Sequence, residues 1–354
     1  MSINRDNHFV PQMYLKRWRI ENSPSKLNVY RLIVPNKNYP MWRTCSIKNT
    51  ALLENLYVRI EDNSEYDDFE INFNEMYETP AAMPLEKACA GSRMTFQEWQ
   101  ILINYILAQY VRVPAFYFFI QNWGSNNIQH ILKSEIDNAI KKVKYNQNKS
   151  EQNSSSKSGT ASLLPIELEL IHADEEHLQP ELKATTVVGK NLWLFAIQVA
   201  LSTSSGVYNF FHKMKWKIIT AYDGITWPTS DNPVVILDIT TGRICFNNDG
   251  VDGKNKLLIL PISPTKAIIG SQIRHFYKNI TASKELTLTI KKAIIENASM
   301  YIYCDYQDPT IALVRKRVVD LDEFHRLQDE FSMWYDKYQK YEAIYLKKNN
   351  CCHY

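Results

Sequence analysis

The segment ILINYILAQYVRVPAFYFFI, residues 101–120, constrains the fold more than any other stretch of this chain. Apolar residues cover nearly every face of a helix through this segment, so the helix must be buried on most sides. Three polar side chains in its middle, together with Pro114, make a membrane span a poor interpretation. Thr95 and Glu98 have the spacing of a capping box, which predicts that a buried helix begins near Thr95 and runs toward Pro114.

The polar side chains of this helix are Asn104, Gln109 and Arg112. With about 100° between successive residues, all three fall within one arc of the helix surface. A buried guanidinium needs a carboxylate or a phosphate beside it, because an unpaired buried charge is costly. One interpretation is an ion pair with an acid of the preceding segment, from the set Glu75, Glu78 and Glu86. The other is an arginine that lines a functional cleft.

The hydrophobic pattern predicts the remaining elements. Helices are expected over 127–145, 191–202 and 284–298. Strands are expected over 27–34, 215–221, 233–239, 256–262, 265–272, 300–305 and 311–319. A long amphipathic C-terminal helix is predicted from Asp320 onward. The class is therefore α+β, with buried helices in the N-terminal half and a mostly antiparallel or mixed sheet in the C-terminal half.

The polar segment NQNKSEQNSSSKSGTAS, residues 146–162, has no large apolar residue and predicts a flexible linker or surface loop. It separates 1–145 from 163–354, which are either two domains or one integrated domain with a flexible loop. The first ten residues lack the apolar core of a secretory signal, and the six cysteines form no CxxC pair. A cytoplasmic protein with reduced cysteines is expected.

Several catalytic classes are disfavoured by the sequence. Only 10 of 354 residues are glycine, and GxGxxG, GxxxxGK[ST] and GxSxG are all absent. HADEEH at 172–177 resembles a zinc motif, but its histidines are five residues apart, whereas a helical zinc pair needs a spacing of four. ELK at 181–183 matches half of a restriction-type nuclease motif, a pattern that a chain rich in Glu and Lys produces by chance. No metal-binding residues are assigned.

Charge is distributed unevenly along the N-terminal part. Residues 1–60 contain ten basic and three acidic side chains, whereas residues 61–80 contain eight acidic and no basic ones. The two segments either neutralise each other or leave a basic face that binds phosphates. In the second case Arg17 and Trp18 would contact substrate, with aromatic rings as stacking platforms for bases. The candidate platforms are Tyr14, Trp18, Tyr30 and Trp42.

The sequence PTSDNPVV at 228–235 places Asp231 directly before a predicted strand. Pro233 restricts the backbone of Asn232 to an extended conformation. Ser-Asp-Asn-Pro is also typical of a turn, in which the aspartate side chain closes an Asx-turn. Asp231 is therefore either a turn residue or a carboxylate of a site.

The order of several motifs resembles DUF4238, a bacterial domain family of unknown function. The motifs are HFVPQMYLKRW at 8–18, ENLY at 54–57, ETPAAMPLEK at 78–87, AQYVRVPAF at 108–116, TSDNPVV at 229–235 and LPISPTKAIIG at 260–270. Some members are counted among candidate anti-phage defence genes, so the resemblance implies an antiviral context. It also implies importance for the positions that match the family pattern: His8, Pro11, Gln12, Gln109, Arg112 and Asp231.

If His8 folds back onto the buried helix, it is expected to meet Glu78, Arg112 and Asp231 in one pocket. A histidine base, a carboxylate and an arginine suit phosphodiester cleavage, with His8 or a bound divalent metal ion activating water. The candidate catalytic residues are His8, Glu78, Arg112 and Asp231, and the candidate substrate-binding residues are Gln12, Arg17, Trp18 and Gln109. The sequence has no second histidine placed for an HNH nuclease and no RxxxxH motif.

A protein that binds without turnover is the alternative prediction. The same residues would then hold nucleic acid or a phage component, and the aromatic C-terminal helix would form a homo-oligomer or a partner contact. A nuclease pocket requires a histidine and a carboxylate within hydrogen-bond reach and open to solvent. A His8 side chain buried against a backbone carbonyl favours binding instead. No membrane association is expected, and the need for a cofactor is left open.

Overall fold

The computed structural model describes residues 4–61, 64–120, 122–123, 166–171, 181–186, 190–245, 255–273 and 281–332. The chain forms two compact units, Met1–Phe116 with Ile197–Tyr335, and Tyr117–Ala196 with Asp336–Tyr354. The larger unit takes residues from both sides of 146–162, so this division differs from a split at that segment. The predicted linker itself and the helix predicted over 127–145 lie outside the described residues.

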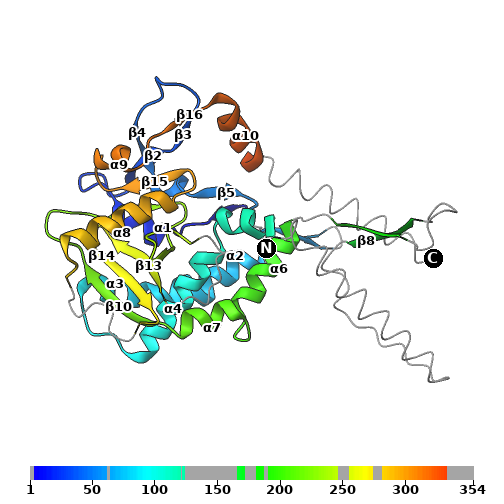
Figure 1. Cartoon of the computed structure of the whole chain (residues 1–354), viewed down its shortest axis with the longest axis horizontal. Helices are drawn as coiled ribbons and strands as arrows, with labels where there is room; N and C mark the ends of the chain where they lie inside the picture. The colour runs from blue at the N-terminus through cyan, green and yellow to red at the C-terminus, as the bar shows by residue number, and fades with distance from the viewer. Residues whose placement is uncertain are drawn as a thin grey trace. The chain divides into compact units, whose positions relative to one another are not determined.

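Helices and antiparallel sheets together confirm the α+β class (Figure 1). The buried helix predicted near residue 95 is α4, Phe96–Val111. The Thr95 hydroxyl accepts a hydrogen bond from the backbone N–H of Glu98, and the Glu98 carboxylate accepts one from the backbone N–H of Thr95. The capping box is therefore complete. Every residue from Tyr105 to Val111 is buried.

Three helical segments that follow one another without a break come before α4. They are α2, Asp68–Asn72, the π-helical turn η3, Phe73–Glu78, and α3, Thr79–Ala90. A π-helical turn widens the helix by one residue per turn and is frequent at functional sites. Gly91 ends α3 with φ of 73°, a left-handed conformation that glycine adopts without strain.

One sheet is built entirely from the C-terminal half, in the antiparallel order β10–β14–β13–β12. Its strands are β10, Lys215–Thr220, β12, Val235–Asp238, β13, Lys256–Ser263, and β14, Lys266–Ser271. Helix α8, Lys284–Asn297, packs on this sheet through Ile290, Ala293 and Ile294. These elements lie where the hydrophobic pattern of the sequence predicts them.

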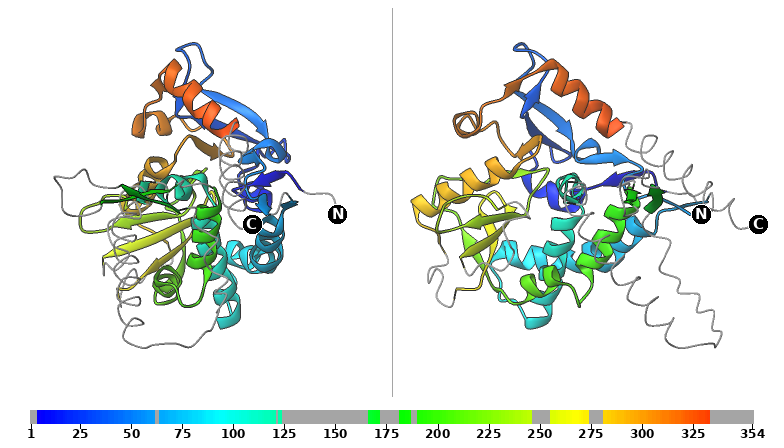
Figure 2. Two further views of the ribbon diagram at one scale, coloured as in Figure 1. Left: turned by 90° about the vertical axis from the view of Figure 1, so that its right-hand side faces the viewer. Right: turned by 45° about the vertical axis from the view of Figure 1, so that its right-hand side comes forward.

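A second sheet combines both halves of the chain, in the antiparallel order β11–β15–β2–β4. Its strands are β11, Thr229–Ser230, β15, Tyr301–Cys304, β2, Lys26–Arg31, and β4, Trp42–Ser46. Ile295 and Ala298, at the end of α8 and just after it, join the core of this sheet. Helix α8 therefore lies between the two sheets within the larger unit (Figure 2). The sequence did not predict that N-terminal strands would pair with C-terminal ones.

The strand predicted over 311–319 is wrong for most of its length. Residues Thr310–Val314 form helix α9, and within this range only β16, Val318–Val319, forms a strand, which pairs in parallel with β3, Ile33–Val34. The helix forms here because of Asp308, two residues before the start of α9. The carboxylate of Asp308 accepts hydrogen bonds from the backbone N–H and the hydroxyl of Thr310 and fixes a helical start.

Shorter elements complete the described fold. Paired strands are β1, Asp6–His8, with β5, Leu52–Glu54, then β6, Arg59–Glu61, with β7, Ser64–Tyr66, and β8, Ile166–Ile171, with β9, Glu181–Thr186. Helical segments are α1, Gln12–Leu15, η1, Lys16–Trp18, η2, Ile47–Asn49, α6, Lys190–Leu201, α7, Gly206–His212, and α10, Leu321–Ser332. The predicted extension of the C-terminal helix beyond α10 lies outside the described residues, as does HADEEH.

Among the described residues, no single helix has the length and apolar character needed to cross a membrane. Phe96–Val111 and Pro114–Ile120 meet that criterion only when taken together, by length and composition, and they are bent by 63° at their junction.

Gly270 in β14 leaves space for the indole of Trp216 on the neighbouring strand β10. A Cβ atom at this position would lie 2.8 Å from ring atoms of Trp216, whose Nε1 donates to the backbone carbonyl of Phe211. Because the ring is held, we expect Gly270→Ala to lower the free energy of unfolding by about 1–3 kcal/mol. Denaturant unfolding followed by tryptophan fluorescence measures the change. Gly206→Ala is the control, since nothing lies within 4 Å of its added Cβ. Equal stability of the two variants would contradict the prediction.

Candidate functional site

Arg112, directly after α4, lies at the centre of a buried polar cluster. Its side chain is 2% exposed. Its Nη1 lies 2.6 Å from Glu78 Oε1, and its Nη2 donates to the backbone carbonyl of His8 at 2.5 Å. The Oε2 atom of Glu70 lies 3.9 Å from the same Nη2. The acidic helical segment α2–η3 therefore neutralises the arginine, as the ion-pair interpretation of the sequence predicts.

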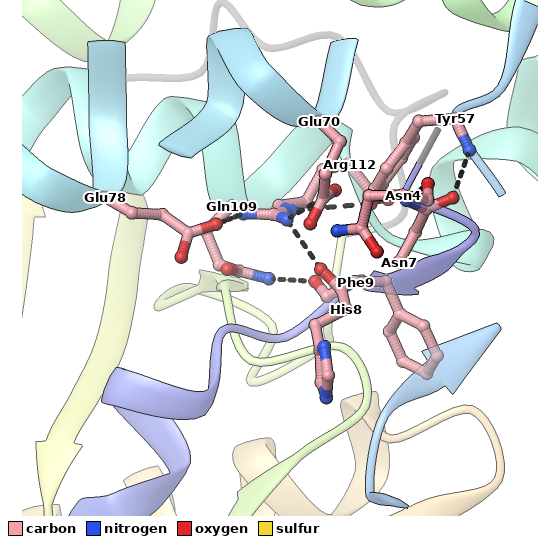
Figure 3. Close-up of polar contacts among 9 residues, drawn as sticks. All are labelled: Asn4, Asn7, His8, Phe9, Tyr57, Glu70, Glu78, Gln109 and Arg112. Atoms are coloured by element: carbon pink, nitrogen blue, oxygen red, sulfur yellow. Dashed lines mark hydrogen bonds and ion pairs between the residues drawn. The ribbon is translucent and has the colours of Figure 1, made fainter. Parts of the chain in front are cut away.

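The cluster also anchors the opening motif HFVPQ to α4. Gln109 Nε2 donates to the backbone carbonyl of Phe9 at 2.8 Å, one residue after the carbonyl that Arg112 holds. Asn7 Oδ1 accepts a hydrogen bond from the backbone N–H of Tyr57. Figure 3 shows the His8 carbonyl turned toward Arg112, while the imidazole points away from it. The motif is therefore held by its backbone, and the His8 side chain is left for another role.

The His8 side chain lines a cavity of about 470 Å³ beside this cluster. The cavity walls come from β1, α1, the segment that contains Lys48 and Asn49, and the acidic helical segment α2–η3. The polar residues in its lining are Asn4, Asp6, His8, Gln12, Lys48, Asn49, Glu70, Asn74 and Glu78. A concave site with several convergent polar groups is the usual form of a binding or active site.

The imidazole of His8 is oriented by one hydrogen bond. Its Nε2 lies 2.9 Å from the backbone carbonyl of Lys48. A carbonyl oxygen only accepts, so Nε2 carries the proton, and in the neutral ring Nδ1 is left with a lone pair. Burial lowers the pKa of His8 below its usual 6.5, and the positive charge of Arg112 acts in the same direction. His8 is therefore a neutral imidazole at pH 7, the form that accepts a proton.

The pKa of Glu70 is shifted in the opposite direction, upward. Burial raises its pKa from 4.5 to about 7, and the nearby Glu78 carboxylate adds to the rise, while Arg112 opposes it. Its Oε2 is buried and forms no hydrogen bond within the described residues. A carboxyl group with a pKa near neutrality holds its proton for about half of the molecules at pH 7. Glu70 can therefore donate a proton where an ordinary glutamate cannot.

A neutral histidine and a protonated carboxyl group that line one cavity form a matched base and acid. Environments that push two titratable groups in opposite directions are the usual basis for assigning such roles. Within the described ranges, no group of three or more His, Cys, Asp or Glu side chains is arranged to hold a metal ion. The chemistry that this arrangement supports directly is proton transfer by His8 and Glu70.

The predicted substrate-binding residues are divided between the cavity and the core. Gln12 lines the cavity. Gln109 does not line it, and its side chain donates to the backbone carbonyl of Phe9. Arg17 donates to the carbonyl of Met13 and pairs with Glu86 at 2.8 Å. Trp18 is fully buried, and its Nε1 donates to the carbonyl of Trp227. An indole in the core offers no face to a base, and Tyr14 and Tyr30 are buried as well.

Asp231 has a different set of partners. Its Oδ1 accepts from the backbone N–H of Ser299, and its Oδ2 accepts from the backbone N–H groups of Met300 and Tyr301. It thus closes the turn between α8 and β15. In the described part of the chain, no hydrogen bond or ion pair joins Asp231 to His8, Glu78 or Arg112. The Asx-turn predicted within Ser-Asp-Asn-Pro is not formed, because Pro233 has no N–H to donate and all three hydrogen bonds of Asp231 come from backbone N–H groups about 70 residues later. Asp231 therefore has a structural role in a different turn, the one between α8 and β15.

Replacing this carboxylate is expected to weaken the fold. In Asp231→Asn the amide nitrogen would face a backbone N–H, so at least one of the three charge-assisted hydrogen bonds is lost. We expect the free energy of unfolding to fall by about 1.5–3 kcal/mol. Denaturant unfolding measures the change, with the exposed Asp322→Asn as control. Unchanged stability of Asp231→Asn would show that the turn does not depend on this carboxylate.

Glu70 and Lys48 are two of the cavity residues that the sequence did not single out. Glu70 belongs to an acidic run in which every carboxylate looks alike in sequence. Its raised pKa results from burial in the folded chain. The buried Phe69 and Phe73, four residues apart, are the one sequence signal of a buried helical face there. Lys48 contributes a backbone carbonyl to His8, a contact that no sequence pattern reports.

Comparison with known proteins gives one match. The family model described as "Protein of unknown function (DUF4238)" matches residues 6–308. No curated protein and no solved structure matches the chain. The match contains the cavity-lining segments around His8, Lys48 and Glu70, whereas Asn4 lies just outside it.

Proposed function

Because the chain belongs to the DUF4238 family, whose description assigns no activity, we propose a function from the site itself: acid–base cleavage of RNA in the cavity lined by His8 and Glu70. The observation that carries this proposal is that His8 and Glu70 line the same cavity, where burial shifts their pKa values in opposite directions. Cleavage of RNA requires only a general base and a general acid, because the 2′-hydroxyl of the RNA itself is the nucleophile.

The proposed step transfers two protons and exchanges one bond for another. His8 Nδ1 takes the proton of the 2′-hydroxyl as the 2′-oxygen attacks the adjacent phosphorus. The bond from phosphorus to the 5′-oxygen breaks, and the Glu70 carboxyl group gives its proton to that leaving oxygen. The products are a 2′,3′-cyclic phosphate and a free 5′-hydroxyl. His8 ends protonated and Glu70 ionised, and exchange with water restores both.

The charges around the cavity permit an anionic substrate. Glu78 is paired with Arg112, and Glu70 is neutral in its acid form. The charged groups that remain in the lining are Asp6 and Lys48, which are opposite in sign. Arg112 itself is buried and paired, so it supports the site by positioning the His8 backbone and does not contact the phosphate.

The test compares three strands of one sequence: RNA, RNA with 2′-O-methyl groups, and DNA. We expect the purified protein to cleave only the unmodified RNA, with or without EDTA, and to leave a cyclic phosphate at the new 3′ end. Cleavage of the methylated strand or of DNA would show that water is the nucleophile and would overturn this mechanism. Loss of cleavage in EDTA would assign the activation to a metal ion.

A role in anti-phage defence is the context that the family resemblance implies. We propose that cleavage of RNA in the infected cell limits phage growth. Plaque formation on a bacterial host that expresses the wild-type protein is expected to be lower than on a host that expresses His8→Ala. Equal plaque numbers, with both proteins present in equal amounts, would separate the activity from defence.

Binding without turnover is the second candidate function. The observation that favours it is the hydrogen bond from His8 Nε2 to the Lys48 carbonyl, the contact expected above of a protein that binds without turnover. Among the described residues no hydrogen bond joins the imidazole to a carboxylate. In that case RNA or a phage component binds the wild-type protein, no strand is cut, and the partner contact involves the C-terminal helix. A protein that retains RNA in a gel-shift assay and leaves it intact would place this candidate first.

A further inference from the structure

A second cavity, of about 520 Å³, lies on the β2–β4–β15 side of the larger unit. Its lining includes Arg31 of β2, Arg43 of β4 and Tyr301 of β15, with Tyr39 from the loop before β4. Leu327 of α10 also lines it. Its volume falls in the range of small-molecule sites. None of the side chains assigned above to proton transfer belongs to this lining.

Two guanidinium groups face this cavity without a carboxylate partner. No ion pair joins Arg31 or Arg43 to an acid of the described residues, and Glu54 is the one acidic side chain in the lining. The Nε of Arg31 is buried and forms no hydrogen bond within the described chain. Arginine presents paired N–H donors that match the oxygens of a phosphate. The cavity therefore offers donors suited to an anion.

Aromatic rings hold these guanidinium groups in place. The Arg31 guanidinium carbon lies 4.1 Å from the ring centre of Phe324 and 5.3 Å from that of Tyr301. Arg43 Nη1 donates to the hydroxyl of Tyr39 at 3.0 Å. Stacked and hydrogen-bonded arginines lose less conformational freedom when they bind a ligand. The half-buried rings of Tyr39 and Tyr301 add flat apolar surface beside the charges.

We infer that this second cavity binds a nucleotide, with the phosphate on Arg31 and Arg43 and the base against the tyrosine rings. Paired guanidinium groups recognise the phosphate, and an aromatic face accepts any base because every base has a flat π surface. The nucleotide is either free or the terminal residue of a nucleic acid strand, since both present the same phosphate and base.

The two cavities are neighbours, since both are lined by Asn49 and Leu52. Nucleotide binding at the second cavity does not depend on cleavage at the first, because the two sites share no charged side chain. It therefore stands even if the protein cleaves nothing.

Calorimetric titration tests the inference with AMP, GMP, CMP and UMP, and with adenosine and inorganic phosphate as partial ligands. We expect at least one mononucleotide to bind at least tenfold more tightly than adenosine or phosphate alone. A 5′-phosphorylated trinucleotide, compared with its 5′-hydroxyl form, distinguishes a strand end from a free nucleotide. If no mononucleotide and neither trinucleotide binds, the inference is overturned.

The matched variants are Arg43→Gln and Arg93→Gln. Both arginines are exposed, so both variants are expected to keep the wild-type melting temperature, but only Arg43 lines the cavity. Arg43→Gln is expected to weaken nucleotide binding at least tenfold, whereas Arg93→Gln leaves it unchanged. Binding that persists in His8→Ala separates this site from the proposed cleavage site. Equal affinity of Arg43→Gln and the wild type would place the nucleotide elsewhere.

Discussion

Arg112→Met is expected to lower the free energy of unfolding by about 3–5 kcal/mol, because it leaves the Glu78 carboxylate without its cation in a largely buried cluster. The same change removes the donor that holds the His8 carbonyl. Denaturant unfolding measures the loss, and Arg93→Met serves as the exposed control. A stable Arg112→Met variant would show that the cluster does not hold the N-terminal segment.

Arg112→Lys sharpens this prediction. Lysine keeps the charge beside Glu78, but it cannot bond the Glu78 carboxylate and the His8 carbonyl with a rigid planar fork. We expect a smaller loss of stability than in Arg112→Met. Equal losses in the two variants would mean that the geometry of the guanidinium, and not its charge, carries the stabilisation.

His8→Ala and Glu70→Gln are each expected to reduce RNA cleavage by about 10²–10⁴-fold, the usual contribution of a positioned acid or base. His8→Ala keeps the backbone carbonyl that Arg112 holds, so the fold should persist. Glu70→Gln keeps the size of the side chain and removes its acidic proton. Cleavage of a labelled RNA under single-turnover conditions measures both effects.

Matched controls distinguish a catalytic loss from a folding loss. His325→Ala and Glu75→Gln remove the same groups at exposed positions outside the cavity, and both should cleave at the wild-type rate. Melting curves of all four variants are recorded beside the rates. A folded His8→Ala protein with wild-type cleavage would remove His8 from the mechanism.

The features that the sequence predicted well are local ones. The capping box at Thr95 and the apolar periodicity of α4 lie within a few residues of each other, and the structure confirms both. Burial of Arg112 follows from its place in an apolar helix, and a carboxylate partner follows from the cost of burying a charge. Glu78 was among the predicted partners for that reason.

The features that the sequence could not predict depend on distant contacts. Trp18 lies among basic and polar neighbours in sequence, yet it is buried against Trp227, more than 200 residues later. Asp231 lies within the residues matched by the family model, as His8 does, but its partners are backbone N–H groups at the start of β15. Glu70 differs from its acidic neighbours only through burial in the folded chain, which raises its pKa.

The pH dependence of RNA cleavage tests the central claim most directly. The proposed step requires Glu70 protonated and His8 neutral, so kcat/KM is expected to fall above about pH 7 as Glu70 loses its proton. It should also fall in acid, below the pKa of His8, which lies under 6.5. The account predicts this bell-shaped profile, with a maximum between the two pKa values. A rate that keeps rising to pH 9, or no cleavage of RNA at any pH, would contradict it.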